Sequence, residues 1–338
     1  MPPSFLSANI VQGLVNVLFG SSSVAAAVGL SDRVDPLSFG LLRVGFACVG
    51  IVSMALANGD SAFAKRDALR LAAASLLLWT SEIMYVTGVQ LAGSIAASIW
   101  QPSQPIMTLV VTAALGTERL TLARVVGIVL AFLGCAVMVL GSASQSGAGG
   151  QAHRHALLGN GCFFVNCLAT VLYVVASQSL IAKYPPLTLA SSTFLLMTCY
   201  YIIVYVGVST LAPNATHYFC EGSACRSFEE LSATAWIAVA YIVVFATLAP
   251  YVMQLWAQGA LPASLISAYY ALQPVAAVLI CFTVIYTTPP PHFGLRGPQQ
   301  TDLAALAVGA GLLLVVRDTA RRGATPTHEQ APLVGQEL

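Results

Sequence analysis

Residues 37–57 read LSFGLLRVGFACVGIVSMALA and contain a single charged side chain, that of Arg43. At about 1.5 Å of rise per residue, a helix of this length crosses the ~30 Å hydrocarbon layer of a bilayer. Comparable apolar runs recur along the 338-residue chain, separated by breaks that are polar or rich in glycine and proline. This pattern predicts a multi-pass membrane protein.

The overall composition excludes the main soluble classes. Hydrophobic residues make up 57% of the chain and charged residues only 8%, whereas a soluble globular protein carries about 25% charged residues. So few charges cannot cover a water-facing surface, which excludes a soluble enzyme, a secreted disulfide scaffold and a disordered protein. The net charge is +1, and the chain lacks the basic surface that a nucleic-acid partner requires.

The apolar runs predict ten membrane-spanning helices. Backbone groups in lipid must be satisfied within the segment, and the alternating pattern of barrel strands is missing from the sequence. The first run lacks a basic segment before it and is too long for a signal-peptide core, so we expect it to be a mature span. The predicted spans are residues 9–30, 37–57, 68–91, 93–116, 120–141, 156–181, 187–211, 234–258, 262–286 and 302–317.

Lysine and arginine placement predicts the orientation, because cytosolic segments are enriched in both. The segments on the side of the N-terminus hold Lys65, Arg66, Arg70, Arg119, Arg124, Lys183, Arg317, Arg321 and Arg322. The opposite segments hold only Arg33, Arg154, Arg226 and Arg296. We therefore expect both termini to be cytosolic, in a plasma membrane or an endomembrane that the sequence does not distinguish.

The largest loop, residues 212–233, is then external. It carries the glycosylation pattern Asn214-Ala215-Thr216, which is used only outside the cytosol. It also carries Cys220 and Cys225, which could form a disulfide in an oxidising compartment. Both features support the predicted orientation.

The chain contains an internal repeat. At an offset of 169 positions, Trp100-Gln101-Pro102-Ser103-Gln104-Pro105 falls on Tyr269-Tyr270-Ala271-Leu272-Gln273-Pro274, and Glu82 falls on Tyr251. At an offset of 150, Asn16 falls on Asn166. Five spans per repeat place the two halves in opposite orientations, the inverted topology of many secondary transporters. The expected organisation is a short cytosolic N-terminus (1–8), a first repeat (9–141), an external loop (142–155), a second repeat (156–317) and a disordered cytosolic tail (318–338).

Several motifs in this order resemble the EamA-type branch of the drug/metabolite transporter superfamily. They are Pro36-Leu37 before Leu42-Arg43, Ser94-Ile95-Ala96-Ala97-Ser98 before Gln104-Pro105, Gly116-Thr117-Glu118-Arg119-Leu120-Thr121 before Gly127-Ile128, Ala260-Leu261-Pro262-Ala263-Ser264, and Ala268 to Pro274. Residues 287–300 depart from the family pattern. The resemblance implies ten helices, export or exchange of a substrate by alternating access, no cofactor and no ATP hydrolysis. The sequence shows no Walker motif, in keeping with that.

Polar side chains within the spans predict a central cavity. Polar groups in hydrocarbon are costly and usually face a cavity or a partner helix. Amides and phenols recur at repeat-related positions and on shared helix faces. The predicted substrate-binding residues are Trp100, Gln101, Gln104, Tyr269, Tyr270, Gln273, Tyr251, Gln254, Tyr85, Asn16 and Asn166. The alternative is structural hydrogen bonding between helices, worth roughly 0.6–2 kcal/mol per contact.

Two charges lie well inside spans, Arg43 and Glu82. Arg43 is expected either to snorkel towards the outer surface or to take part in a structural ion pair. Glu82 is deeper and too short to snorkel, so it is predicted to couple transport to protons or to touch substrate. The rival interpretation is a static ion pair between Glu82 and Arg43.

The predicted function is therefore secondary transport of a small organic solute that is neutral, zwitterionic, aromatic or cationic. A nucleotide-sugar or sugar-phosphate translocator is the alternative, but it should show several cationic side chains facing the cavity, and only Arg43 is available. A membrane-embedded enzyme is disfavoured because all five histidines lie in loops or the tail, with no metal-like or triad spacing. A receptor without transport activity does not require an inverted repeat. The expected partners are the solute and the lipid bilayer, with a homodimer left open.

Overall fold

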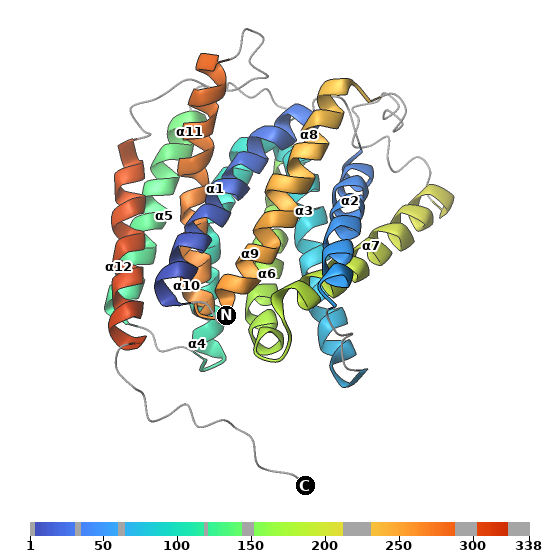
Figure 1. The fold of residues 1–338 in the computed structure, drawn as a ribbon. Coiled ribbons are helices and arrows are strands. Elements are labelled where there is room, and N and C mark those ends of the chain that lie inside the picture. The colour runs from blue at the N-terminus through green and yellow to red at the C-terminus, as the bar shows by residue number, and fades with distance from the viewer. Residues whose placement is uncertain are drawn as a thin grey trace.

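The computed structural model describes residues 4–30, 35–59, 65–117, 121–143, 152–211, 231–287 and 303–323. All regular elements within these ranges are helical (Figure 1). The first half contains α1 (Phe5–Leu30), α2 (Pro36–Ala57), the 3-10 turn η1 (Lys65–Asp67), α3 (Ala68–Trp100), the 3-10 turn η2 (Gln101–Ser103), α4 (Gln104–Ala114) and α5 (Leu122–Ala143). The second half contains α6 (Ala152–Ile181), α7 (Pro186–Leu211), α8 (Ala233–Val243), the π-helical turn η5 (Val244–Leu248), α9 (Ala249–Gln258), α10 (Ala263–Ala268), the 3-10 turn η6 (Tyr269–Ala271), α11 (Leu272–Thr287) and α12 (Ala305–Gly323).

The helices confirm an integral multi-pass membrane protein. Seven stretches of the described chain are long and apolar enough to cross a bilayer, and two further apolar helices, Gln104–Ala114 and Leu122–Gly134, are shorter. Large apolar side chains such as Val126, Val129 and Leu133 are exposed on the outside of the bundle, as a lipid-facing surface requires. The count of ten spans stays a prediction.

Local sequence signals explain where several helices begin and end. Asp35 caps α2 by accepting a hydrogen bond from the Ser38 amide at 2.8 Å, and Pro36 occupies the first turn, where its missing amide costs nothing. Ser232 caps α8 in the same way through the Ala235 amide. Beyond the end of α4, Gly116 has a φ of 66°, a conformation that glycine adopts without strain.

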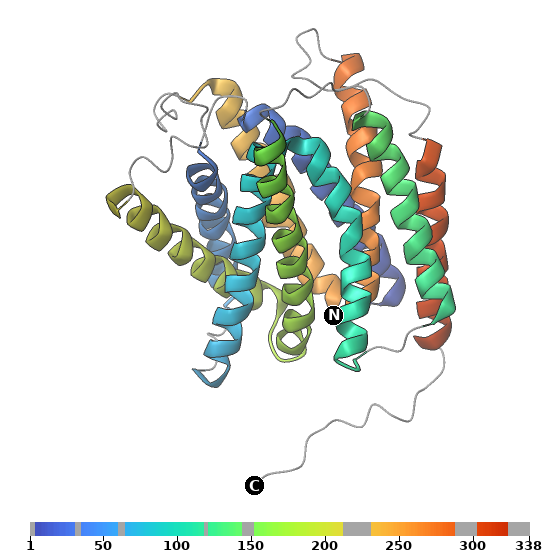
Figure 2. The ribbon, with the colours of Figure 1, turned by 180° about the vertical axis from the view of Figure 1, so that it is seen from behind.

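α3 reverses its direction along its length. Asn166 donates to the Ser81 carbonyl at 2.9 Å, and the neighbouring Cys167 thiol contacts the Trp100 carbonyl at 3.4 Å. The 19 residues from 81 to 100 would span about 28 Å in a straight helix, so the chain must fold back between them. In Figure 2 the two resulting rods stand on either side of α6, and they converge at the loop end of the bundle. The reversal agrees with a predicted boundary between the third and fourth spans.

Two central helices, α1 and α6, each pack mainly against helices of the other half of the chain. α1 packs against α8, α9 and α11, whereas α6 packs against α3 and α4. α2 likewise pairs with α7, and α5 with α12. Each of these contacts joins one half of the chain to the other. A cavity in the middle of the bundle is therefore bordered by both halves.

Both ends of the described chain lie at one end of the bundle. α1 begins and α12 ends there, whereas the end of α7 and the start of α8 lie at the opposite end (Figure 1). We refer to these as the terminal end and the loop end. Near the terminal end, Asp67 accepts hydrogen bonds from Tyr184 at 2.7 Å and from Lys183 at 3.1 Å. These two bonds hold the pKa of Asp67 below its usual value and join the start of α3 to the turn after α6.

Several helices extend beyond the predicted spans. α1 begins at Phe5, four residues before the predicted span 9–30, and α6 begins at Ala152, four residues before the predicted span 156–181 and within the predicted loop 142–155. α12 continues through Gly323, so the first residues of the predicted disordered tail are helical. Polar contacts explain this extension, because Asp318 accepts from Thr121 and pairs with Arg124, and Thr319 contacts Arg124. Asn214, Cys220, Cys225, the segment 288–302 and the tail from 324 lie outside the described residues.

Candidate functional site

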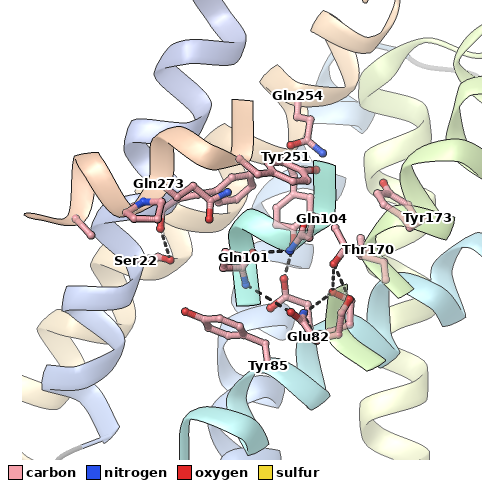
Figure 3. Close-up of a pocket in the computed structure, with 18 of the residues that line it drawn as sticks. Ser22, Glu82, Tyr85, Gln101, Gln104, Thr170, Tyr173, Tyr251, Gln254 and Gln273 are labelled. Atoms are coloured by element: carbon pink, nitrogen blue, oxygen red, sulfur yellow. Dashed lines mark hydrogen bonds between the residues drawn. The ribbon is translucent and has the colours of Figure 1, made fainter. Parts of the chain in front are cut away.

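A cavity of about 100 Å³ lies in the centre of the bundle. One water molecule needs roughly 10–15 Å³ of such space, so the cavity has room for several waters or a small solute. Most of the predicted polar residues line it together, drawn from both halves of the chain (Figure 3). These are Arg43, Glu82, Tyr85, Gln101, Gln104, Asn166, Tyr251, Gln254, Tyr270 and Gln273.

The cavity is accessible from the loop end. On α1, the lining residues Phe19 and Ser22 are half-exposed, whereas Asn16, one turn nearer the terminal end, is buried. From η2 to α4, which run away from the loop end, Gln101 is half-exposed and Gln104, one turn nearer the terminal end, is buried. The same gradient on these two segments indicates that the cavity opens towards the loop end.

A layer of polar contacts closes the terminal end below the cavity. Ser177 donates to Gln258 at 3.0 Å, and Gln178 donates to the Leu261 carbonyl at 3.1 Å. Tyr269 donates to Asn9 at 2.8 Å. These bonds join α6 and α1 to the region around α10, so that helices of both halves meet there.

The ion pair between Arg43 and Glu82 forms one wall of the cavity. An Arg43 Nη1 atom lies 2.7 Å from Glu82 Oε2, and the two side chains are only 9% and 12% exposed. Tyr251 donates to the other carboxylate oxygen. The geometry expected of a static pair is therefore present in this conformation.

The other nitrogens of Arg43 are held by the π-helical turn η5. Its Nε donates to Thr247 Oγ1 at 2.8 Å, and Nη2 donates to the Ala246 carbonyl at 3.5 Å. In an α-helix the Ala246 carbonyl would accept from residue 250, which is Pro250 and has no amide hydrogen. The irregular turn thus offers polar groups to a guanidinium that arrives from α2. π-helical turns of this kind are frequent at functional sites.

The amides lining the cavity belong to two hydrogen-bonded groups. In one, Gln273 donates to Asn16, which lies behind it, at 3.0 Å. In the other, Gln104 donates to Gln101, which donates to Asn166 at 3.4 Å. Structural hydrogen bonding and a cavity-facing position are therefore combined in the same residues.

Three predicted residues do not line the cavity. Trp100 donates to Asn160 at 2.8 Å and packs edge-to-face on Phe164, so it faces α6. Tyr269 belongs to the closing layer, and Asn16 lies behind Gln273. Their assignment as substrate-binding residues remains a prediction without support from this conformation.

The cavity also has lining residues that the sequence-based set omitted, among them Phe19, Ser22, Ser81 and Thr170. Helical spacing could have identified some of them. Thr170 and Tyr173 follow Asn166 by four and seven positions, so they share its helix face. Phe19 follows Asn16 by three positions and shares a face with it in the same way. Tyr173 was recognisable in the sequence by this spacing.

Comparisons with known proteins agree with the geometry. Residues 8–140 match the model of the EamA-like transporter family. An uncharacterized transporter from Archaeoglobus fulgidus is 34% identical over 100 residues, a match that spans 30% of this chain and about a third (32%) of that relative. A protein of known crystal structure superposes with a TM-score of 0.68 over 95% of this chain and 100% of its own, at 17% identity. This last likeness concerns the fold alone.

The family match covers nearly all of the first predicted repeat (9–141), from within α1 to within α5, and the motifs quoted for that repeat lie inside it. The likeness to the EamA-like transporter family therefore extends over residues 8–140 of the chain.

Proposed function

We propose that this protein is a secondary transporter that moves a small organic solute through the central cavity by alternating access. The observation that carries the proposal is a polar cavity lined by both halves of the chain, accessible at one end and closed at the other. Secondary transporters built from inverted repeats place their substrate sites at this position. The family match favours transport over a membrane-embedded enzyme or a receptor.

The proposal includes ten helices in two inverted five-helix repeats. The sequence offset of 169 equates Glu82 with Tyr251, and these two side chains hydrogen-bond each other. A residue can touch its own counterpart only beside a two-fold axis, so this contact supports an axis that passes through the cavity. The 3-10 turns η2 and η6 lie at nearly equivalent positions and also contact each other.

We further propose that the terminal end is cytosolic and that the cavity is accessible from the external side. Tags fused at residue 1 and at residue 338 should both be protected from an impermeant label in intact cells. Replacing Asn214 by Gln should remove any glycan on the external loop. Labelling of either tag without permeabilisation would reverse the orientation.

The hydrogen bonds that Arg43 makes to protein groups bear on the class of solute. Phosphate is typically held by free arginine or lysine donors, but Arg43 donates from Nε, Nη1 and Nη2 to protein groups. A neutral, zwitterionic, aromatic or cationic solute is therefore favoured over a nucleotide sugar or a sugar phosphate.

Transport by the purified protein in vesicles tests the proposal, using a panel of metabolites with and without a pH gradient. Gln104→Leu and Gln273→Leu should each raise the KM for the transported solute by about 3–10-fold, the effect of one lost hydrogen bond. The thermal midpoint should stay near that of the wild type. Gln90→Leu is the matched control, because Gln90 lies on α3 outside the set of lining residues. Parallel losses of stability and transport would instead indicate that the amides serve as structural hydrogen bonds between helices.

A further inference from the structure

Two amide oxygens in the wall of the cavity have no hydrogen-bond donor. They are Oε1 of Gln104, at the start of α4, and Oε1 of Gln254, in α9. The two residues are only 2% and 3% exposed, and both line the cavity. Leaving a buried acceptor unsatisfied destabilises a protein. A donor-bearing ligand in the cavity would satisfy both.

Neighbouring side chains already hydrogen-bond both amides. The Gln104 nitrogen donates to Gln101, and Gln254 hydrogen-bonds Tyr270. The oxygens are therefore the atoms left for a ligand. Figure 3 shows the two amides on either side of Tyr251, one contributed by each half of the chain.

The remaining wall suits a positive charge. Phe19, Tyr85, Tyr173, Tyr251 and Tyr270 all line the cavity. Aromatic faces attract cations, most strongly where the site is desolvated. The two ionic side chains of the cavity, Arg43 and Glu82, neutralise each other at 2.7 Å, so they do not repel a cation as an isolated arginine would.

We propose that Gln104 and Gln254 accept hydrogen bonds from the primary ammonium group of an organic amine, which is enclosed by the aromatic side chains of the same cavity. An ammonium group has three donors and no acceptor, so it can donate to both unsatisfied oxygens at once. The proposal rests on the proposed function for its role in transport, but the binding step can be measured separately.

Binding to the full-length protein in lipid nanodiscs tests the inference with three related probes. Phenethylammonium carries charge and N–H donors, its N,N,N-trimethyl analogue carries charge without donors, and N-acetylphenethylamine is neutral. Phenethylammonium should bind about tenfold more tightly than either analogue, because two hydrogen bonds to amide oxygens are lost with the trimethyl group and the charge is lost with the acetyl group.

Variants of the two glutamines identify the site. Gln104→Met and Gln254→Met keep the length of the side chain without the acceptor, and each should weaken phenethylammonium binding about 3–10-fold. Binding of the trimethyl analogue should change less than about twofold, since it makes no such bonds. Gln104→Glu and Gln254→Glu retain acceptor oxygens and should preserve or strengthen phenethylammonium binding. Gln90→Met, outside the cavity, is the matched control for all four variants.

The outcomes separate this inference from the transport function. Equal binding of phenethylammonium and its trimethyl analogue would overturn it, and so would Met variants that weaken both probes alike, because an aromatic cage alone would then explain binding. Equal binding of the neutral probe would overturn the role of the charge. Selective binding that depends on both glutamines, without uptake into vesicles, would support the site and contradict the transport function.

Discussion

Replacing Arg43 by Met should destabilise the protein by about 3–5 kcal/mol, because a buried charge loses its partner. Glu82 is 12% exposed and pairs with Arg43 at 2.7 Å. In the variant its carboxylate keeps only the hydrogen bond from Tyr251. Arg43 also donates to two polar groups of η5, the Thr247 hydroxyl and the Ala246 carbonyl. Both lose this donor in the variant.

Neutralising both partners should restore much of this loss. In Arg43→Met/Glu82→Gln no buried charge remains, and removing a complete ion pair is far less costly than removing one member. Thermal unfolding of the single and double variants in the same detergent gives the coupling energy between the two sites. A double variant no more stable than Arg43→Met would contradict a stabilising pair.

The variant Glu82→Gln also distinguishes the two roles considered for Glu82. If the acid exchanges a proton during transport, the variant should fold, and its transport rate should lose the pH dependence of the wild type. An unchanged pH profile in a folded, active variant would exclude Glu82 as the coupling residue. A variant that misfolds and is rescued by also neutralising Arg43 would identify the pair as structural.

Replacing Gly311 by Ala should give the second large effect, a loss of about 2–3 kcal/mol from overpacking. A Cβ atom at Gly311 would lie 2.4 Å from the Gly127 carbonyl and 2.7 Å from the Ala131 amide nitrogen. Both are backbone atoms of α5, so α5 and α12 would have to separate. Small residues allow membrane helices to approach this closely, and their packing replaces the hydrophobic effect as the source of stability.

Gly309→Ala is the matched control, two residues away on the same helix. A Cβ atom at Gly309 meets nothing within 4 Å, so only the higher helix propensity of alanine should act, by up to about 1 kcal/mol in the stabilising direction. Thermal unfolding and size-exclusion profiles of both variants provide the measurement. Equal midpoints for the two would show that the α5–α12 contact is looser than the structure indicates.

Much of the architecture could be predicted from the sequence because its causes are local. The cost of exposing a backbone to lipid depends only on the segment, so apolar runs such as residues 37–57 determined the membrane class and the position of most helices. Motif order and spacing indicated the resemblance to EamA-type transporters, and the family model matches residues 8–140. Helical spacing also grouped Gln101 with Gln104, and Tyr251 with Gln254, on shared faces. Each of these four residues does line the cavity.

Only the tertiary structure decided which neighbour each of those faces meets. Spacing orients a side chain relative to its own helix, but the rotation of that helix in the bundle is set by packing against other helices, such as the close approach of α5 and α12. Trp100 and Gln104 are four residues apart, yet the 3-10 turn between them directs Trp100 to Asn160 and Gln104 to the cavity. The sequence left the Arg43–Glu82 pair as one of two interpretations. Its geometry depends on a π-helical turn about 200 residues away from Arg43 along the chain, which no local pattern reveals.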